Sequence, residues 1–197
     1  MQIENHKEEV PFEHYAELFR GADAQEMAAR SGAEFDGEKF YVNLLGVDYA
    51  IAYPTAQFTP GAALPVQTFL LRYLLEGKEV RWQGNWKTFR EMPWGELYIT
   101  PYTGRVLTRA AFTFGFKLPK FKAACEKMGA TPLKHGDAGY EFAFLGRFRM
   151  QIMIWEGDDE FPPNAQVIYS DNFAEGFAAE DRVVAGDILI STIKANM

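Results

Sequence analysis

Four carboxylates crowd into five consecutive positions late in the chain, between a strand-like segment and a pair of prolines. They are Glu156, Asp158, Asp159 and Glu160. Closely spaced carboxylates can bind a hard cation through oxygen, and they can also share a proton and serve as acid and base. The ligand spacing of an EF-hand, with its closing Glu, is absent. The loop is therefore a candidate site for a cation or for acid–base chemistry.

A structural interpretation explains the same loop. Trp155 and Phe161 flank the carboxylates and would anchor an exposed acidic turn to the core, which is the interpretation we prefer. Asp171 follows the next strand-like segment, and it joins the loop only if the fold brings the two together. Asp158, Glu160 and Asp171 are therefore held as candidate metal ligands, and no metal is assigned.

A second set of residues suited to binding lies among the tryptophans. Three of the four tryptophans fall between positions 82 and 94, and an arginine–glutamate pair lies among them. Indole rings stack on planar or cationic groups and an arginine can bind an anion with two hydrogen bonds, so the set could hold a planar or anionic ligand. The alternative is that the rings anchor a long insertion while the charged pair is bonded internally. The candidates here are Trp86, Arg90, Glu91 and Trp94, joined from the acidic loop by Trp155, Glu156, Asp158 and Asp159.

The other residue types that commonly carry chemistry are sparse. His6, His14 and His135 are scattered without zinc-ligand spacing, and Cys125 falls on an apolar helical face where a buried thiol is expected. Glycine-rich phosphate loops and the nucleophile-elbow motif are absent from the sequence. No catalytic residue and no cofactor are therefore assigned, and enzymatic activity stays undecided.

The composition is that of a globular protein. Hydrophobic residues make up 48% of the 197 residues, which is enough to bury a sizeable core. The formal net charge of −7 argues against nucleic acid as a partner. The sequence has no apolar run of transmembrane length and no leader peptide at its N-terminus, so we expect no membrane association and a cytoplasmic location. A single cysteine suits that reducing compartment.

The charges are unevenly distributed along the chain. Residues 156–197 hold nine acidic and two basic residues, whereas residues 97–136 hold seven basic residues and one acid. The simplest explanation is that the two segments lie near each other and compensate, or that each is solvated. The alternative is an anion site on the basic segment.

Apolar periodicity and turn residues predict a mixture of helices and strands, and hence an α+β protein. Helices are expected where apolar side chains recur on one face behind a proline or a capping residue, at 11–20, 23–31, 65–77, 119–128 and 180–194. Strands are expected where apolar side chains alternate, at 40–45, 49–53, 96–100, 109–114, 140–145, 148–154 and 166–169.

The chain also contains a faint internal repeat. The pattern of residues 41–46, which ends in Leu-Leu-Gly, recurs at residues 141–146, which end in Phe-Leu-Gly. Each copy follows a short helix and precedes an alternating strand, so we predict two pseudo-symmetric helix–hairpin–helix units that share an antiparallel or mixed sheet. The predicted organisation is an N-terminal helix at 1–22 and a single α+β domain at 23–197, with repeat halves at 23–77 and 118–197 and an aromatic insertion at 78–117.

Three segments together resemble a known family. They are the Trp86–Glu91 segment, the helix at 69–75 and the acidic loop at 155–162. The resemblance is to the uncharacterised prokaryotic family filed as domain of unknown function 3786, and it covers residues 24–195. It implies a cytoplasmic single-domain protein and brings no known activity or catalytic residues. Some members carry a cysteine-rich, iron–sulfur-like extension, but this chain has only Cys125, so nothing of that cofactor carries over.

We therefore expect a binding or interaction module whose site is a cleft at the seam between the repeats, lined by the aromatic insertion and the acidic loop. The alternative is a metal-assisted hydrolase or similar enzyme that uses the carboxylates of residues 156–160. A third hypothesis is a scaffold that docks a partner through its basic or acidic segment. The partner is an unknown small molecule or protein, and homo-oligomerisation stays open.

Overall fold

The computed structural model describes residues 9–197 and divides them into two compact units, each built from helices and antiparallel strands. The first unit holds the described residues up to Asn43 together with Val47–Glu79. The second holds Leu44–Gly46 and Val80–Met197. Within the described residues, none of the helices is both long enough and apolar enough to span a bilayer.

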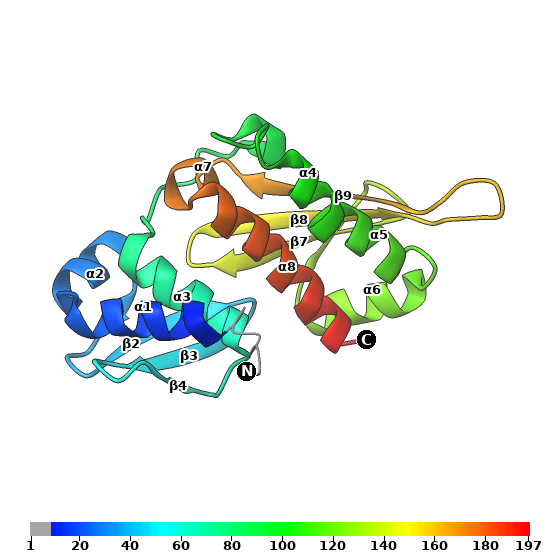
Figure 1. Cartoon of the computed structure of the whole chain (residues 1–197). Helices are drawn as coiled ribbons and strands as arrows, with labels where there is room; N and C mark the ends of the chain where they lie inside the picture. The colour runs from blue at the N-terminus through cyan, green and yellow to red at the C-terminus, as the bar shows by residue number, and fades with distance from the viewer. Residues whose placement is uncertain (1–8) are drawn as a thin grey trace, which may run out of the picture. The chain divides into compact units, whose positions relative to one another are not determined.

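The first unit packs three helices with a small group of strands. Its elements are α1 (Glu9–Gly21), α2 (Ala24–Ser31), β1 (Glu34–Phe35), β2 (Lys39–Leu44), β3 (Val47–Ala52), β4 (Gln57–Thr59) and α3 (Leu64–Glu76). Strand β3 lies between β2 and β4, and β1 pairs with β2. Asp23 caps α2 by accepting the N–H of Glu26 at 2.9 Å, as its sequence predicts. Figure 1 shows α1 and α3 side by side, and Phe19 of α1 and Phe69 and Leu70 of α3 are buried.

The second unit is a larger antiparallel sheet with helices packed on it. Its strands are β5 (Trp86–Thr88), β6 (Thr131–Leu133), β7 (Ala138–Leu145), β8 (Phe148–Trp155) and β9 (Asn164–Ser170). Its helices are η1 (Phe89–Glu91), α4 (Ile99–Tyr102), the π-helix η2 (Thr103–Thr108), α5 (Arg109–Phe114), α6 (Leu118–Lys127), α7 (Phe173–Gly176) and α8 (Ala179–Ala195). The strand order is β7–β8–β9–β5, and β6 also pairs with β7.

The two faces of this sheet have different neighbours. Side chains alternate along a strand, so Phe148, Ile152 and Ile154 of β8 point to one face, where they are fully buried. Helix α5 contacts β8 and β9, and η2 contacts β9. Gln151 and Met153 of β8 point to the opposite face, which carries the site described below.

Two predicted strands are wrong. Residues 96–100 and 109–114 were expected to be strands because their apolar side chains alternate, but residues 99–114 form one helical run through α4, η2 and α5. The side chains that decide this are Tyr102, Val106, Ala110 and Phe114, which recur every four residues and are all buried. The short strands β1, β4, β5 and β6 and the single-turn helix α7 were not predicted, because two to four residues carry too little periodicity.

Both predicted hairpins are present, β2–β3 and β7–β8. Gly46 and Gly146 lie at their turns with φ of 83° and 52°, the left-handed region that glycine adopts most easily. The relationship of the two halves by duplication stays a prediction. Residues 80–117 supply the edge strand β5 and the helical run that contacts β9, so they belong to the packing of the second unit.

Candidate functional site

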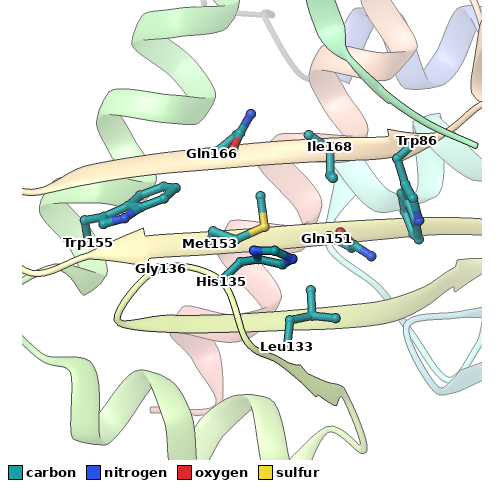
Figure 2. Close-up of a pocket in the computed structure, with 9 residues that line it drawn as sticks. All are labelled: Trp86, Leu133, His135, Gly136, Gln151, Met153, Trp155, Gln166 and Ile168. Carbon is teal, nitrogen blue, oxygen red and sulfur yellow. The ribbon is translucent and has the colours of Figure 1, made fainter.

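The second unit carries an open hollow of about 470 Å³ on the sheet face opposite the helical run. Figure 2 shows Trp155 and Trp86 at opposite ends of a row of side chains, with Met153, His135 and Gln151 between them. The residues that line the hollow are Trp86, Leu133, His135, Gly136, Gln151, Met153, Trp155, Gln166 and Ile168.

The strand register sets the floor of the hollow. Gln151 and Met153 alternate on β8, and on β9 Ile168 lies opposite Gln151 while Gln166 lies opposite Met153. Directly opposite residues on one face of a sheet are near enough for their side chains to touch. The edge strand β5 places Trp86 opposite Ser170, beyond Ile168. The floor is therefore built on rigid strands.

The loop at residues 135–137 forms one wall, and backbone contacts fix it in place. The N–H of Asp137 donates to the carbonyl oxygen of Ile154 at 3.0 Å, and the carboxylate of Asp137 accepts the N–H of Glu156 at 2.8 Å. Gly136 has a φ of 68°, and a Cβ added there would lie 2.9 Å from the carbonyl oxygen of Ile154. Only glycine fits this close approach, which holds His135 beside the hollow.

A polar network borders the Trp86 end of the hollow. Glu141 accepts from Arg149 Nη1 at 3.0 Å and from Gln151 Nε2 at 3.0 Å. The guanidinium of Arg149 lies 5.5 Å from the ring centre of Trp82, and the ring of Trp82 meets that of Trp86 edge-on at 5.3 Å. The charges of Glu141 and Arg149 therefore compensate each other, and Gln151 is held through its amide nitrogen.

The structure brings together two of the three predicted tryptophans, and it places Arg90, Glu91 and Trp94 outside the lining of the hollow. Trp86 and Trp155 line the same hollow. Arg90 forms an exposed ion pair with Glu96 at 3.0 Å, and Trp94 is 69% exposed. Glu91 accepts the backbone N–H and the hydroxyl of Thr88, both at 2.7 Å, which caps η1 and lowers the pKa of the Glu91 carboxyl.

The acidic loop between β8 and β9 is a hydrogen-bonded turn. Asp158 accepts the N–H of Phe161 at 2.7 Å and the N–H of Glu160 at 2.8 Å, and these bonds lower the pKa of its carboxyl. Glu156, Asp159 and Glu160 are exposed. Phe161, which we expected to anchor the turn to the core, is 67% exposed, so that part of the interpretation is wrong.

Asp171 lies away from the acidic loop. It follows the last residue of β9, whereas the loop precedes the first, so the length of the strand separates them. Its carboxylate accepts the N–H groups of Gln83 at 3.0 Å and Asn85 at 3.2 Å. Among residues 9–197, three or more His, Cys, Asp or Glu side chains do not converge on any point where they could hold a metal ion.

Comparison with known proteins identifies the family. The family model described as "Domain of unknown function (DUF3786)" matches residues 23–192. The chain belongs to this family. In the same comparisons, no curated protein and no solved structure matches the chain. The resemblance found in the sequence is thereby confirmed, and the family description assigns no activity.

Sequence reasoning missed most of the hollow in this family member. Gln151, Met153, Gln166 and Ile168 were not candidates, because each is ordinary for a strand when taken by itself. One signal was available. Strand β8 carries apolar residues on both faces, with Met153 and Trp155 opposite Ile152 and Ile154. A strand of an α+β sheet with two apolar faces is either covered on both or offers one for binding.

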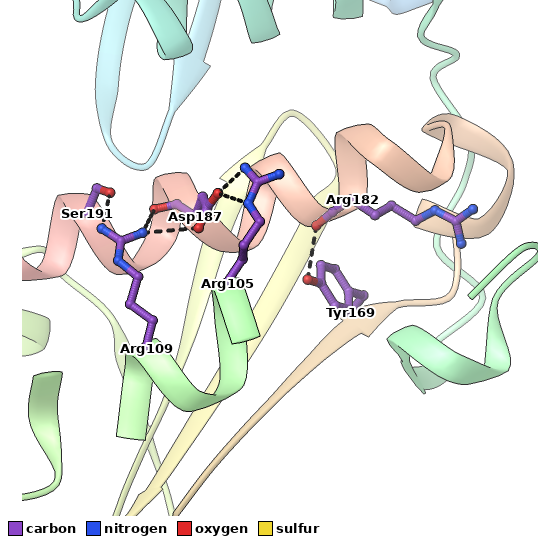
Figure 3. A network of polar contacts seen from close by, with 6 residues as sticks. All are labelled: Arg105, Arg109, Tyr169, Arg182, Asp187 and Ser191. Atoms are coloured by element: carbon purple, nitrogen blue, oxygen red, sulfur yellow. Dashed lines mark hydrogen bonds and ion pairs between the residues drawn. The ribbon is translucent and has the colours of Figure 1, made fainter. Parts of the chain in front are cut away.

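The basic segment and the acidic C-terminal part do compensate where they meet. Figure 3 shows Asp187 of α8 between Arg105 and Arg109. Asp187 accepts from Arg105 Nε at 3.0 Å and from Arg109 Nη1 at 3.1 Å, and Arg109 Nη2 also donates to Ser191 at 2.9 Å. These two arginines are therefore engaged in packing α8 against η2 and α5.

Proposed function

We propose that this family member is a binding module that holds a small molecule in the hollow on the open sheet face of its second unit. One observation carries the proposal. Trp86 and Trp155, from segments about seventy residues apart in sequence, line a single hollow together with the amides of Gln151 and Gln166. Aromatic walls with a few convergent polar groups are typical of small-molecule sites, and such sites usually measure about 300–1,000 Å³.

The hollow differs in two respects from the cleft expected from the sequence. Its lining holds no residue of the first predicted repeat half at 23–77, so it does not lie at the expected seam between the repeats. It joins the aromatic segment, through Trp86, with the start of the acidic loop, through Trp155, as expected. The carboxylates of that loop are not part of its lining. The binding candidates Arg90, Glu91 and Trp94 likewise lie outside the lining, so the proposal keeps Trp86 and Trp155 as the binding residues.

The enzymatic alternative has less support. It uses the carboxylates of the acidic loop, Asp158, Asp159 and Glu160, with Asp171 as a further candidate. Asp158 closes a turn, and Asp171 holds the Gln83–Asn85 segment at the other end of β9. The proposal is therefore one of binding, with no catalytic step assigned.

A thermal-shift screen of uncharged and charged metabolites, with matched variants, tests this proposal. A ligand of the hollow raises the melting temperature of the wild-type protein, and it raises that of Trp155→Ala much less. Trp94→Ala serves as the control, because it removes an indole that lies outside the lining. A ligand that stabilises the wild-type and Trp155→Ala proteins equally, or one that the protein converts chemically, would contradict the proposal.

A further inference from the structure

We infer that the ligand of the hollow is an uncharged, planar heteroaromatic ring system. The inference rests on the proposed function, because it specifies the ligand of the same site. Its first support is the charge of the lining, since none of the nine described residues around the hollow is Lys, Arg, Asp or Glu. Of the charged groups beside the lining, Glu141 is bonded to Arg149 at 3.0 Å, and the carboxylate of Asp137 accepts the N–H of Glu156 at 2.8 Å. A charged ligand would lose hydration here without gaining a counter-charge.

The second support is the flat shape of the apolar lining and the polarisability of its sulfur and indole groups. The floor is one face of a sheet, and the indoles of Trp86 and Trp155 lie at its two ends (Figure 2). Met153 lies between them and is 4% exposed. A thioether sulfur makes favourable contacts with aromatic rings, and indoles pack against planar rings edge-on or in an offset stack. The lining therefore complements a flat aromatic body.

The third support is the small number of polar side chains, which distinguishes a heteroaromatic ring from a sugar. Three polar side chains, His135, Gln151 and Gln166, stand among five apolar ones, Trp86, Leu133, Met153, Trp155 and Ile168. A sugar carries hydroxyl groups around its whole rim, and each hydroxyl buried without a partner is costly. A heteroaromatic ring has two apolar faces and carries its polar atoms only in the plane of its edge, so its faces can pack on the apolar side chains while its edge meets the three polar ones.

Of the three polar side chains in the lining, Gln151 has the most firmly fixed orientation. It is 8% exposed, and its Nε2 donates to Glu141 at 3.0 Å. That bond uses one of the two amide hydrogens and fixes the orientation of the group, whose oxygen can accept from a ligand. An amide oxygen accepts from a ring N–H or an exocyclic amino group. Gln166, which is exposed, can donate or accept beside it.

The test is a titration of the full chain with four probes, followed by isothermal calorimetry. Adenine and lumichrome represent uncharged heteroaromatic rings, maltose an uncharged sugar, and phenyl phosphate a charged ring. We expect adenine or lumichrome to bind the wild-type protein, and Trp155→Ala to weaken that binding by about tenfold, since one aromatic stack is lost. Gln166→Ala should also weaken it. Because Gln166 is exposed, that variant tests the site without disturbing the core. Trp94→Ala should bind as the wild type does.

The other results overturn the inference in distinguishable ways. Preference for maltose or phenyl phosphate, with the same dependence on Trp155, would overturn the ligand class and leave the proposed site intact. If a ring probe binds equally well to the wild type, to Trp155→Ala and to Gln166→Ala, the probe binds elsewhere, and the assignment of ring ligands to the hollow is wrong. If neither ring probe binds up to its solubility limit while the thermal-shift screen yields a sugar or a charged ligand that depends on Trp155, the ligand class is wrong and the site stands.

Discussion

Replacing Asp187 by Asn should destabilise the second unit by about 1 kcal/mol. The carboxylate of Asp187 is 22% exposed and pairs with Arg105 and Arg109, which are 52% and 37% exposed. Ion pairs with this much solvent access contribute roughly 0.2–1 kcal/mol each, so two pairs give about 0.4–2 kcal/mol. Asn has nearly the same shape and can still accept one hydrogen bond, which places the expected loss near the middle of that range.

Urea denaturation followed by circular dichroism measures this loss. Asp159→Asn is the matched control, because it makes the same change of charge at an exposed position in the acidic loop. The difference between the two variants should shrink at about 1 M salt, where the Debye length falls to roughly 3 Å. A double-mutant cycle with Arg109→Gln then isolates the pair at 3.1 Å.

Two results would refute this reasoning. In one, Asp187→Asn and Asp159→Asn differ by less than about 0.3 kcal/mol, so that the network contributes nothing beyond an ordinary surface charge. In the other, the difference does not depend on salt. The loss would then come from the packing of α8 rather than from its charges.

Three further predictions follow from single contacts. Gly136→Ala should lower the free energy of unfolding by about 1–3 kcal/mol and weaken the binding of any ligand in the hollow. The reason is that the φ of Gly136 is 68° and the new Cβ would lie 2.9 Å from the carbonyl oxygen of Ile154. Gly104→Ala, where no atom lies within 4 Å of the added Cβ, should not destabilise the protein. The pKa of the Asp158 carboxyl, measured by carbon-13 NMR, should lie below 3.8, because the N–H groups of Phe161 and Glu160 favour its charged form. The contribution of this carboxylate to stability is present above its pKa in the unfolded chain and is lost as the pH falls through its pKa in the folded protein. A folded-state pKa at or above 3.8 would contradict the turn. Burial and the bond to Glu126 raise the pKa of Tyr140 to about 12, so ultraviolet difference spectra should show this phenol ionising about two pH units above an ordinary tyrosine. Its contribution to stability should be lost as the pH rises from 10 to 12. Tyr140→Phe identifies the signal, and ionisation near pH 10 in the folded protein would contradict the assignment.

The sequence predicted the elements whose signals are local and redundant. Helix α3 has a proline at its start, a glycine after its end and a broad apolar stripe, and it forms from Leu64 to Glu76. The strand alternation of β8 and the turn at Gly146 were equally clear. Residues 96–100 and 109–114 were wrongly predicted as strands because Leu97 and Ile99, and Phe112 and Phe114, alternate locally. The side chains that pack recur instead at every fourth position.

The candidate site could be predicted only in part. Trp86 was found because it belongs to a cluster of tryptophans, and Trp155 because it flanks the acidic loop. Gln151 and Gln166 could not be found, because their proximity depends on the register of β8 against β9 and not on spacing along the chain. The carboxylates of Asp158 and Asp171 drew attention by their charge, but in the fold they accept backbone N–H groups.

The most direct test of the binding proposal is methyl NMR of the full chain labelled at methionine. The chain has seven methionines, and Met153→Leu assigns the one on the floor of the hollow. With the ligand from the thermal-shift screen, we predict that the Met153 methyl resonance shifts while that of the buried Met150, on the opposite face of β8, moves little. A ligand that leaves the Met153 resonance unchanged would contradict the assignment of the hollow as the binding site.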